Sequence, residues 1–261
     1  MADEHPLKPF YSVLVLAFAC SALVATAAVG LAPLQEANRS IDKKKNILNA
    51  AGIYQKDRPV EDQFSAIEAR IIDLASGKFV TNEDSASKES AQTSPAVAMD
   101  SSRDLEREED IAGIRELEKY SYVYLVKNNG QIDQVVLPVR GKGLWSTMYA
   151  YVAIDADMTT LRGVSFYEHG ETPGLGGEVE NPRWQSGWQK KKVYTPDGEV
   201  KFSIVKSGSQ SSPEEAAYQV DGLSGATLTS QGVETLMQFW FGEHGYKPFF
   251  NQIKKQGGFN G

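Results

Sequence analysis

The sequence predicts an α+β protein in which a single N-terminal transmembrane helix precedes a domain with a mainly antiparallel sheet and flanking helices. Three observations support this fold class. No residue from Pro9 to Gln35 is charged. From residue 122 onward, short runs rich in Val, Ile and Tyr alternate with turn residues, as is typical of strands. Near the C-terminus, apolar residues recur with helical spacing from Val233 to Phe241, which predicts a helix that is buried on one side.

Val, Leu, Ala and Phe dominate residues 11–34. At about 1.5 Å per residue, roughly twenty such residues span the hydrocarbon core of a bilayer. We therefore expect a short N-terminus at 1–10 and a transmembrane helix at 11–34. The alternative is a cleaved secretory signal, with Ala25-Thr26-Ala27 as the cleavage site. The apolar run continues past this site to Leu34, and this favours the anchor.

The composition excludes several classes of protein. The 261 residues carry a net charge of -7, which argues against nucleic acid as a partner because a basic face is required to neutralise phosphates. The only cysteine, Cys20, lies in the apolar segment. There is thus neither a disulfide framework nor a cysteine-based metal site.

Residues 35–120 are interpreted as a helical scaffold region. Apolar spacing predicts helices over Ile41 to Gln55, Gln63 to Leu74 and Leu105 to Tyr120. Between the last two, residues 81–103 are rich in Ser, Ala, Asp and Glu without apolar periodicity, which is typical of a mobile loop.

Residues 121–261 are predicted to form the main domain. Asn128-Asn129-Gly130 is a turn sequence between two strand-like runs, so a β-hairpin is expected there. The predicted strands are Tyr122 to Val126, Ile132 to Val139, Met148 to Ile154, Leu161 to Glu168, Val200 to Lys206 and Tyr218 to Val220, and two further helices are predicted at Asn181 to Lys190 and Phe249 to Lys255.

The stretch from Asp221 to Ser230 places small residues and hydroxyls directly before the amphipathic helix. Unpaired backbone N–H groups and the positive end of the helix dipole favour a phosphate at such a helix start. Thr229 and Ser230 are expected to be simple N-caps. Thr227 differs, because Gly225 and Ala226 leave its hydroxyl approachable by a large group. Asp221 could bind a metal or hold the turn.

Two motifs carry a resemblance to a known family. Asp221-x-x-Ser224-Gly225-Ala226-Thr227 resembles the acceptor motif on which a flavin transferase forms a phosphoester between FMN and a threonine hydroxyl. His169-Gly170-Glu171-Thr172-Pro173-Gly174-Leu175-Gly176 is similar to the segment that lies against the flavin in the same family. The chain as a whole resembles the C subunit of the sodium-translocating NADH:quinone oxidoreductase, from the apolar segment to the acceptor helix.

The resemblance implies that residues 121–261 form an FMN-binding domain with covalent FMN on Thr227. No general-base dyad or nucleophile triad is evident in the sequence, so no catalytic residue and no metal site are assigned, and the flavin itself would be the reactive group. Lys206 is expected near the phosphate or the reduced flavin, with an ordinary surface lysine as the alternative. Glu171 would repel an anionic flavin if charged, so it is expected to orient its loop instead. The other expected contacts with FMN are Asp221, Ser224, Gly225, Ala226, Leu228, Thr229, Thr172, Gly174, Leu175, Gly176, Gly143, Leu144 and Trp145.

Other motifs in the chain are weaker. The Gly141 to Thr147 loop lacks the spacing of a P-loop, and His169-x-Glu171 matches only half of a zinc deaminase signature that also needs two cysteines. Trp184 and Trp188, four residues apart, are interpreted as core residues. No Gly-x-Gly-x-x-Gly follows a predicted strand, so hydride transfer from a nicotinamide is assigned to a partner.

The resemblance further implies an electron relay inside a complex that oxidises NADH, reduces ubiquinone and exports sodium. Its partners would be the other subunits, a flavin transferase during maturation, and the lipid of a bacterial inner membrane. Arg39 and three lysines follow the span while Lys8 alone precedes it, and this count favours a cytoplasmic domain. The resemblance implies a periplasmic domain. The alternatives are the G subunit of the Rnf electron-transport complex and a membrane-anchored flavin-binding sensor.

Overall fold

The structure is a computed structural model that describes residues 8–80 and 102–259. The predicted N-terminus at 1–10 and the predicted loop at 81–103 therefore lie largely outside the described residues. The chain divides into two compact units, Met1–Asp42 and Lys43–Gly261.

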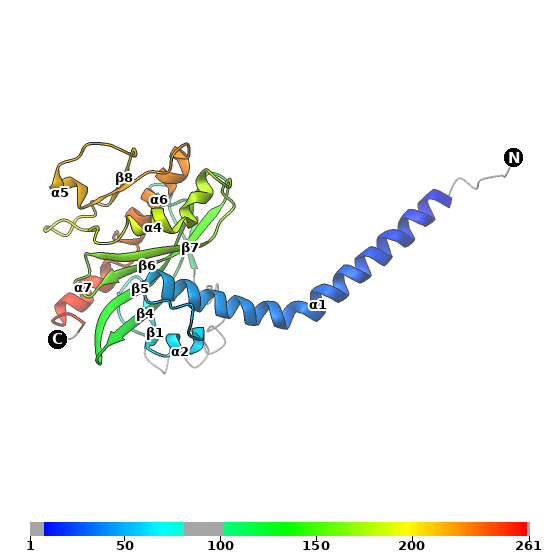
Figure 1. Cartoon of the computed structure of the whole chain (residues 1–261), viewed down its shortest axis with the longest axis horizontal. Coiled ribbons are helices and arrows are strands. Elements are labelled where there is room, and N and C mark those ends of the chain that lie inside the picture. The colour runs from blue at the N-terminus through cyan, green and yellow to red at the C-terminus, as the bar shows by residue number, and fades with distance from the viewer. Residues whose placement is uncertain (1–7, 81–101, 260–261) are drawn as a thin grey trace. The chain divides into compact units, whose positions relative to one another are not determined.

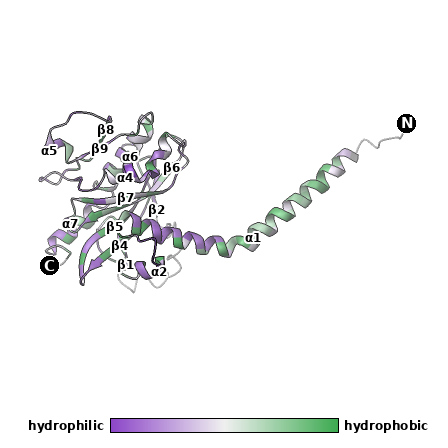
Figure 2. Ribbon diagram, in the orientation of Figure 1, coloured by the Kyte–Doolittle hydropathy of each residue, from purple (hydrophilic) through white to green (hydrophobic). Residues whose placement is uncertain are grey.

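The first unit consists of most of helix α1, which runs over Lys8–Ala50. This helix is long and apolar enough to cross a membrane, and none of its most apolar stretch is buried. Side chains such as Leu23 and Val29 are 72% and 76% exposed, whereas a core helix would bury them. Figure 2 shows the hydrophobic residues of α1 concentrated in its N-terminal part. These features are consistent with a single-pass membrane anchor. The helix expected at Ile41 to Gln55 is the end of α1, not a separate helix.

The second unit is built on a five-stranded antiparallel sheet with the strand order β1-β4-β5-β6-β7. The predicted hairpin is confirmed. Asn129 and Gly130 both have positive φ, 52° and 82°, as the two central residues of a type I′ turn require. Two of the other predicted strands are confirmed in this sheet. The strands are β1 (Ile67–Asp73), β4 (Tyr120–Asn128), β5 (Gln131–Lys142), β6 (Thr147–Asp155) and β7 (Leu161–Glu168).

The two faces of the sheet have different cores because successive side chains point to opposite sides. On one face, Val123, Leu137 and Val152 pack with residues of α6 (Thr227–Trp240) and α7 (Lys247–Lys255). On the other, Tyr124 and Tyr151 pack with the last turns of α1. Figure 1 shows this sheet and the helices beside it. The sheet therefore separates the acceptor helix from a tyrosine-rich core.

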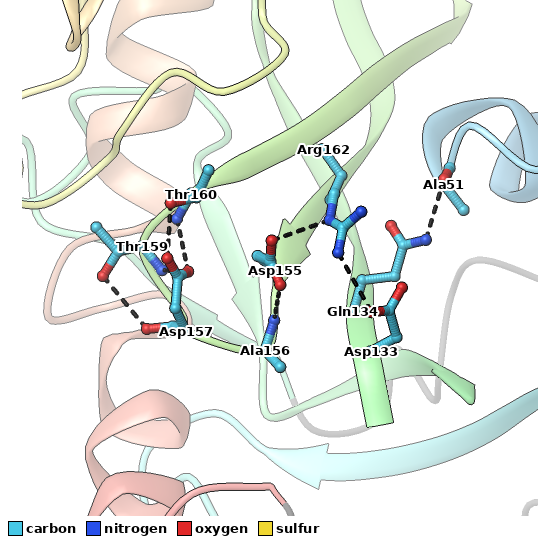
Figure 3. A network of polar contacts seen from close by, with 9 residues as sticks. All are labelled: Ala51, Asp133, Gln134, Asp155, Ala156, Asp157, Thr159, Thr160 and Arg162. Carbon is cyan, nitrogen blue, oxygen red and sulfur yellow. Dashed lines mark hydrogen bonds and ion pairs between the residues drawn. The ribbon is translucent and has the colours of Figure 1, made fainter. Parts of the chain in front are cut away.

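One end of the sheet is held by a polar network (Figure 3). Arg162 on β7 bridges Asp155 on β6 and Asp133 on β5, at 3.0 and 3.2 Å. Beside them, the side chain of Gln134 donates to the backbone oxygen of Ala51, just past the end of α1, at 3.0 Å. These contacts fix the three strands and the end of α1 to one another within the second unit.

Smaller elements surround the sheet. The predicted strands at Val200 to Lys206 and Tyr218 to Val220 are confirmed as short strands that pair in parallel. The helix expected at Asn181 to Lys190 begins where predicted, with Asn181 as its N-cap, but it ends at Ser186, so Trp188 lies outside it. The bounds are α2 (Val60–Phe64), β2 (Ser102–Asp104), β3 (Glu116–Glu118), the 3-10 helix η3 (Gly176–Glu180), α4 (Pro182–Ser186), β8 (Ser203–Val205), α5 (Pro213–Ala216) and β9 (Gln219–Asp221).

The helix predicted over Gln63 to Leu74 is wrong. Helix α2 ends at Phe64, and β1 follows, paired along its whole length with β4. The apolar residues fit a helical period, but the β-branched Ile67, Ile71 and Ile72 suit a strand, and pairing with the sheet decides between the two. The sheet thus draws one strand from the region before residue 121.

The helix predicted over Leu105 to Tyr120 is also wrong. Gly113 and Arg115 have φ of 65° and 66°, a left-handed conformation that interrupts a helix. The carboxylate of Asp110 accepts hydrogen bonds from the N–H groups of Ile114 and Arg115, both at 2.8 Å. This local side-chain contact satisfies the backbone in place of helical hydrogen bonds, and β3 begins directly afterwards.

Candidate functional site

Helix α6 begins at Thr227, as predicted, and its start lacks a side-chain cap. Ala226 occupies the N-cap position and forms no side-chain hydrogen bond. The first N–H groups of a helix have no partner within it, so an uncapped start that faces solvent is suited to an anion. Thr227 and Leu228 are exposed there, while Ala226 is buried.

Thr229 and Ser230 are not the N-caps that the sequence suggests. Both lie inside α6 and are buried. The hydroxyl of Ser230 accepts a hydrogen bond from the N–H of Leu223 at 3.0 Å, and the hydroxyl of Thr229 donates to a carboxylate oxygen of Glu171 at 2.6 Å. They connect the helix to two loops instead, which leaves the helix start free.

Residues 221–226 contain most of the predicted acceptor motif, and this segment, the acceptor loop, is fixed at its start by backbone contacts. Strand β9 pairs with β8 up to Asp221, and the N–H of Gly222 donates to the carbonyl of Val205 at 2.7 Å. The indole N–H of Trp184 donates to the carbonyl of Asp221 at 2.7 Å. With the Leu223 to Ser230 hydrogen bond at the other end, the loop has a defined position before Thr227.

The acceptor loop also contacts the second motif. Gly225 has a φ of +73°, and a Cβ placed on it would lie 3.1 Å from Cδ2 of Leu175. Only glycine adopts this conformation without strain and allows so close an approach. Leu175 therefore lies next to the residue that is two positions before Thr227.

The carboxylate of Glu171 is the centre of the site. It accepts hydrogen bonds from the backbone N–H groups of Trp145 at 2.9 Å, Leu144 at 3.2 Å and Ser146 at 3.3 Å, in addition to the Thr229 hydroxyl. Glu171 is only 5% exposed. Burial by itself raises its pKa, but the hydrogen bonds from Thr229, Trp145, Ser146 and Leu144 outweigh burial and hold the pKa below its usual value. The carboxylate is therefore charged at neutral pH.

Glycines allow these segments to approach. A Cβ on Gly143 would lie 2.5 Å from Oε1 of Glu171, and one on Gly176 would lie 2.5 Å from Oγ1 of Thr229. On α6, a Cβ on Gly232 would collide with the carbonyl of Lys142. Side chains at these positions would push the three segments apart, so close backbone packing is a condition of the carboxylate contacts.

Large apolar side chains remain exposed around this centre. Leu144 is 43% exposed, Trp145 67%, Leu175 44% and Leu228 57%. They come from three segments that the Glu171 hydrogen bonds and the Gly225 contact hold together. Exposed apolar residues gathered beside an anion site are typical of a binding surface for a ligand with an apolar part.

Comparisons with known proteins agree with this geometry. The model of the FMN-binding domain family matches residues 143–242, which contain every predicted flavin contact. The chain is 42% identical to the C subunit of the Na(+)-translocating NADH-quinone reductase of Pseudomonas aeruginosa, over 97% of this chain and 98% of that protein. For the same subunit of Yersinia pestis, identity is 43% over 98% of both chains. The chain belongs to the family of C subunits of the Na(+)-translocating NADH-quinone reductase.

Solved structures of the family share the fold. The crystal structure of Shewanella oneidensis NqrC has a TM-score of 0.73 and 34% identity, and it covers 84% of this chain and 99% of its own. The C subunit from Parabacteroides distasonis has a TM-score of 0.61 and 26% identity, with 84% and 96% covered. The fold class and the family that the sequence predicts are both confirmed.

The other residues that the sequence predicts as flavin contacts are exposed. Thr172 and Gly174 are exposed in a turn in which the carbonyl of Thr172 accepts from the N–H of Leu175 at 3.1 Å. Ser224 and Asp221 are exposed in the acceptor loop, and the Lys206 side chain is exposed after β8. No group of three His, Cys, Asp or Glu side chains that could hold a metal occurs within residues 8–80 and 102–259.

Trp184 and His169 make contacts that the sequence does not indicate. Trp188 is fully buried, as expected for a core residue, but Trp184 is partly exposed and holds the carbonyl of Asp221. His169 accepts from the N–H of Glu171 through Nδ1 at 3.1 Å, and its Nε2 lies 3.1 Å from Glu180. The spacing of Trp184 and Trp188 predicts a shared helix face but not which carbonyl one of them contacts.

Proposed function

We propose that this member of the family carries FMN as a phosphoester on Thr227 and relays single electrons through it within a sodium-translocating NADH:quinone oxidoreductase. The single observation that carries the proposal is the position of Thr227. Thr227 is exposed at the uncapped start of α6, and exposed apolar side chains from three segments lie in the same part of the domain.

The helix start would hold the phosphate. A phosphoester on Thr227 carries a negative charge that the N–H groups of the first turn and the helix dipole stabilise. Ala226 contributes no competing acceptor at the N-cap. Gly225 and Ser224, both exposed, leave space in front of the hydroxyl for the flavin and for the enzyme that attaches it.

The exposed apolar side chains would hold the ring. FMN, when bound, supplies one-electron chemistry that no side chain of this chain offers. Leu144, Trp145, Leu175 and Leu228 would contact the faces of the isoalloxazine and exclude water from it. Thr172 and the backbone N–H groups of its loop would donate to the polar edge of the ring. Lys206 is proposed as a cation near the phosphate, close in the chain to Val205, which contacts Gly222.

Glu171 would act as a positioning residue. Its charge is satisfied by three backbone N–H groups and the Thr229 hydroxyl, so it orients the Leu144 loop against α6. This arrangement agrees with the expected role of Glu171 in orienting the loop.

The partners follow from the family. The relatives are named as subunits of an NADH-quinone reductase, and the sequence contains no Gly-x-Gly-x-x-Gly after a strand. NADH oxidation and quinone reduction are therefore assigned to other subunits, and attachment of FMN to a flavin transferase. The names of the relatives favour this complex over the Rnf complex and over a sensor. We place the chain in a bacterial inner membrane, anchored in lipid by α1, with its domain on the periplasmic side.

Covalent flavin can be tested directly. The full chain, expressed in a host that has the transferase, is denatured, separated by electrophoresis and inspected for flavin fluorescence, and its intact mass is measured. Thr227→Ala should lose both the fluorescence and the added mass of FMN. Thr235→Ala is the matched control, because Thr235 lies on the same helix and donates only to the carbonyl of Gly232. Covalent flavin retained in Thr227→Ala would contradict the proposal.

A further inference from the structure

A cavity of about 390 Å³ lies outside the predicted flavin site, and no residue of the acceptor loop lines it. It opens on the face of the sheet that packs against the end of α1, and it is lined mainly by aromatic and charged side chains. Five tyrosines on β4, β6 and β7 form much of its wall. The lining residues include Lys43, Glu118, Tyr122, Arg140, Tyr149 and Tyr151.

The cavity exists because β4 and β5 separate. Their pairing ends at Tyr124 and Val136, while β5 continues to pair with β6 as far as Lys142. Pro138 has no N–H to donate to a neighbouring strand. Its carbonyl accepts from the hydroxyl of Tyr246 at 2.6 Å, and the carbonyl of Arg140 accepts from the indole of Trp240 at 2.7 Å. Side chains thus satisfy these two backbone carbonyls of β5 where it leaves β4. The opening is therefore part of the stable fold.

The wall of the cavity contains tyrosine rings that pack on one another. Tyr151 and Tyr167 are stacked with their ring centroids 4.9 Å apart, and Tyr122 and Tyr124 are stacked at 6.1 Å. Tyr149 is half-buried at the edge of this group. Aromatic side chains arranged in this way favour another planar ring as the occupant.

Two polar groups of the wall lack a matching partner. Arg140 pairs with Oε1 of Glu118 at 2.6 Å, but Oε2 of Glu118 is buried and accepts no hydrogen bond from residues 8–80 or 102–259. The ammonium of Lys43 lies 5.4 Å from the centroid of the Tyr122 ring, and it forms no ion pair with any of the residues that the structure describes. A buried acceptor without a donor is costly. An occupant that donates to Glu118 and accepts from Lys43 would satisfy both.

The charges of the wall restrict the occupant further. Arg115, Arg140 and Lys43 face Glu116 and Glu118 around the cavity, which leaves one positive charge in excess. A neutral or singly negative molecule therefore fits, and a cation does not.

We propose that this cavity binds a small planar aromatic molecule with a ring hydroxyl, which donates to Glu118, and a carbonyl or carboxylate oxygen, which accepts from Lys43. The tyrosine rings stack on its faces. The site is separate from the acceptor loop and does not depend on the attachment of FMN to Thr227.

Binding can be measured with two probes on the full chain in detergent. They are 6-hydroxy-2-naphthoate, which has a carboxylate, and 6-hydroxy-2-acetonaphthone, which has a neutral carbonyl. Isothermal titration calorimetry, corrected with empty micelles, should give saturable one-to-one binding of at least one probe. The probe that binds more tightly shows whether a carboxylate or a neutral carbonyl accepts from Lys43. 2-Naphthoate, which lacks the hydroxyl, should bind more weakly. If neither hydroxylated probe binds saturably, the proposal is overturned.

Matched lysine variants locate the site. Lys43→Met should weaken binding about tenfold, the loss expected for one charge-assisted hydrogen bond. Lys45→Met is the control, because Lys45 also lies over a tyrosine ring, that of Tyr54 at 5.6 Å, but does not line the cavity. Tyr149→Leu removes an aromatic ring at the rim of the cavity and should also weaken binding. This variant tests the site independently if Lys43→Met folds poorly. Equal affinities in Lys43→Met, Tyr149→Leu and Lys45→Met would overturn the proposal.

Discussion

The hydroxyl of Thr229 donates a 2.6 Å hydrogen bond to Glu171, and this contact joins the acceptor helix to both loops that flank the proposed flavin. Thr229 is 1% exposed and Glu171 5%. The same carboxylate oxygen that accepts from Thr229 also accepts from the N–H of Leu144 at 3.2 Å. The position of the exposed apolar side chains relative to Thr227 therefore depends on two buried side chains that need not touch the flavin.

Thr229→Val keeps the volume of the side chain but removes its hydroxyl. We expect the free energy of unfolding to fall by about 1–3 kcal/mol, because a buried charged acceptor loses one of its four donors. Urea unfolding of the full chain in detergent measures the change. Thr235→Val, on the same helix, removes a hydroxyl that donates only to a backbone carbonyl and should cost less. Covalent flavin should persist in Thr229→Val, because the acceptor loop is unchanged.

Glu171→Gln tests the charge of the carboxylate through pH. The folded pKa of Glu171 lies below its unfolded value, which is about 4.3. Its charge therefore stabilises the folded state above about pH 4.3, and this stabilisation is lost as the pH falls through the folded pKa. The difference in unfolding free energy between the unsubstituted protein and Glu171→Gln should be largest near neutral pH and should shrink below about pH 4. Glu214→Gln, at an exposed position, should show no such pH dependence.

The sequence predicts the elements that depend on neighbouring residues better than those that depend on contacts between distant parts of the chain. The Asn129-Gly130 turn, strands β6 and β7, and the start of α6 are set by local patterns and are predicted correctly. The strand β1 is not, because the spacing of Ile67 and Ile71 fits a helix and only pairing with β4 makes it a strand.

In the site, too, the features set by neighbouring residues are predicted and those set by distant residues are not. The neighbouring small residues single out Thr227, and the structure places it exposed at the helix start. The contact of Glu171 with Thr229 joins residues 58 positions apart, and the contact of Trp184 with the Asp221 carbonyl has no signal in the residue types. Buried hydrogen bonds between distant segments depend on packing, which spacing along the chain does not encode.

The side of the membrane on which the domain lies can be tested with reporter fusions. The basic residues after the apolar segment favour the cytoplasm, but long translocated domains follow this count poorly. We expect a reporter that is active only in the periplasm, fused after Gly261, to be active, and a reporter that is active only in the cytoplasm to be inactive at the same position. The opposite pair of results, with both fusions stably expressed, would place Thr227 and the proposed flavin in the cytoplasm.

Leu175→Ala tests the environment of the flavin ring separately from its attachment. A phosphoester on Thr227 leaves the ribityl chain free to rotate, so other loops must hold the ring for electron transfer to have a defined geometry. Leu175 is 44% exposed and lies against Gly225 in the acceptor loop, which places an apolar side chain beside the tether. Its truncation should leave covalent flavin intact, because neither Thr227 nor the hydrogen bonds of its loop change.

The expected effect of Leu175→Ala is on the redox potential of the flavin. Loss of the side chain admits water to the ring, and water stabilises the more charged redox state relative to the neutral one. Redox titration of the purified protein, followed by flavin absorption, should therefore show shifted midpoint potentials. Ile111→Ala is the control, because Ile111 is similarly exposed, at 49%, in a segment outside the site. Midpoints that stay the same in Leu175→Ala and Ile111→Ala would show that the Leu175 loop does not surround the ring.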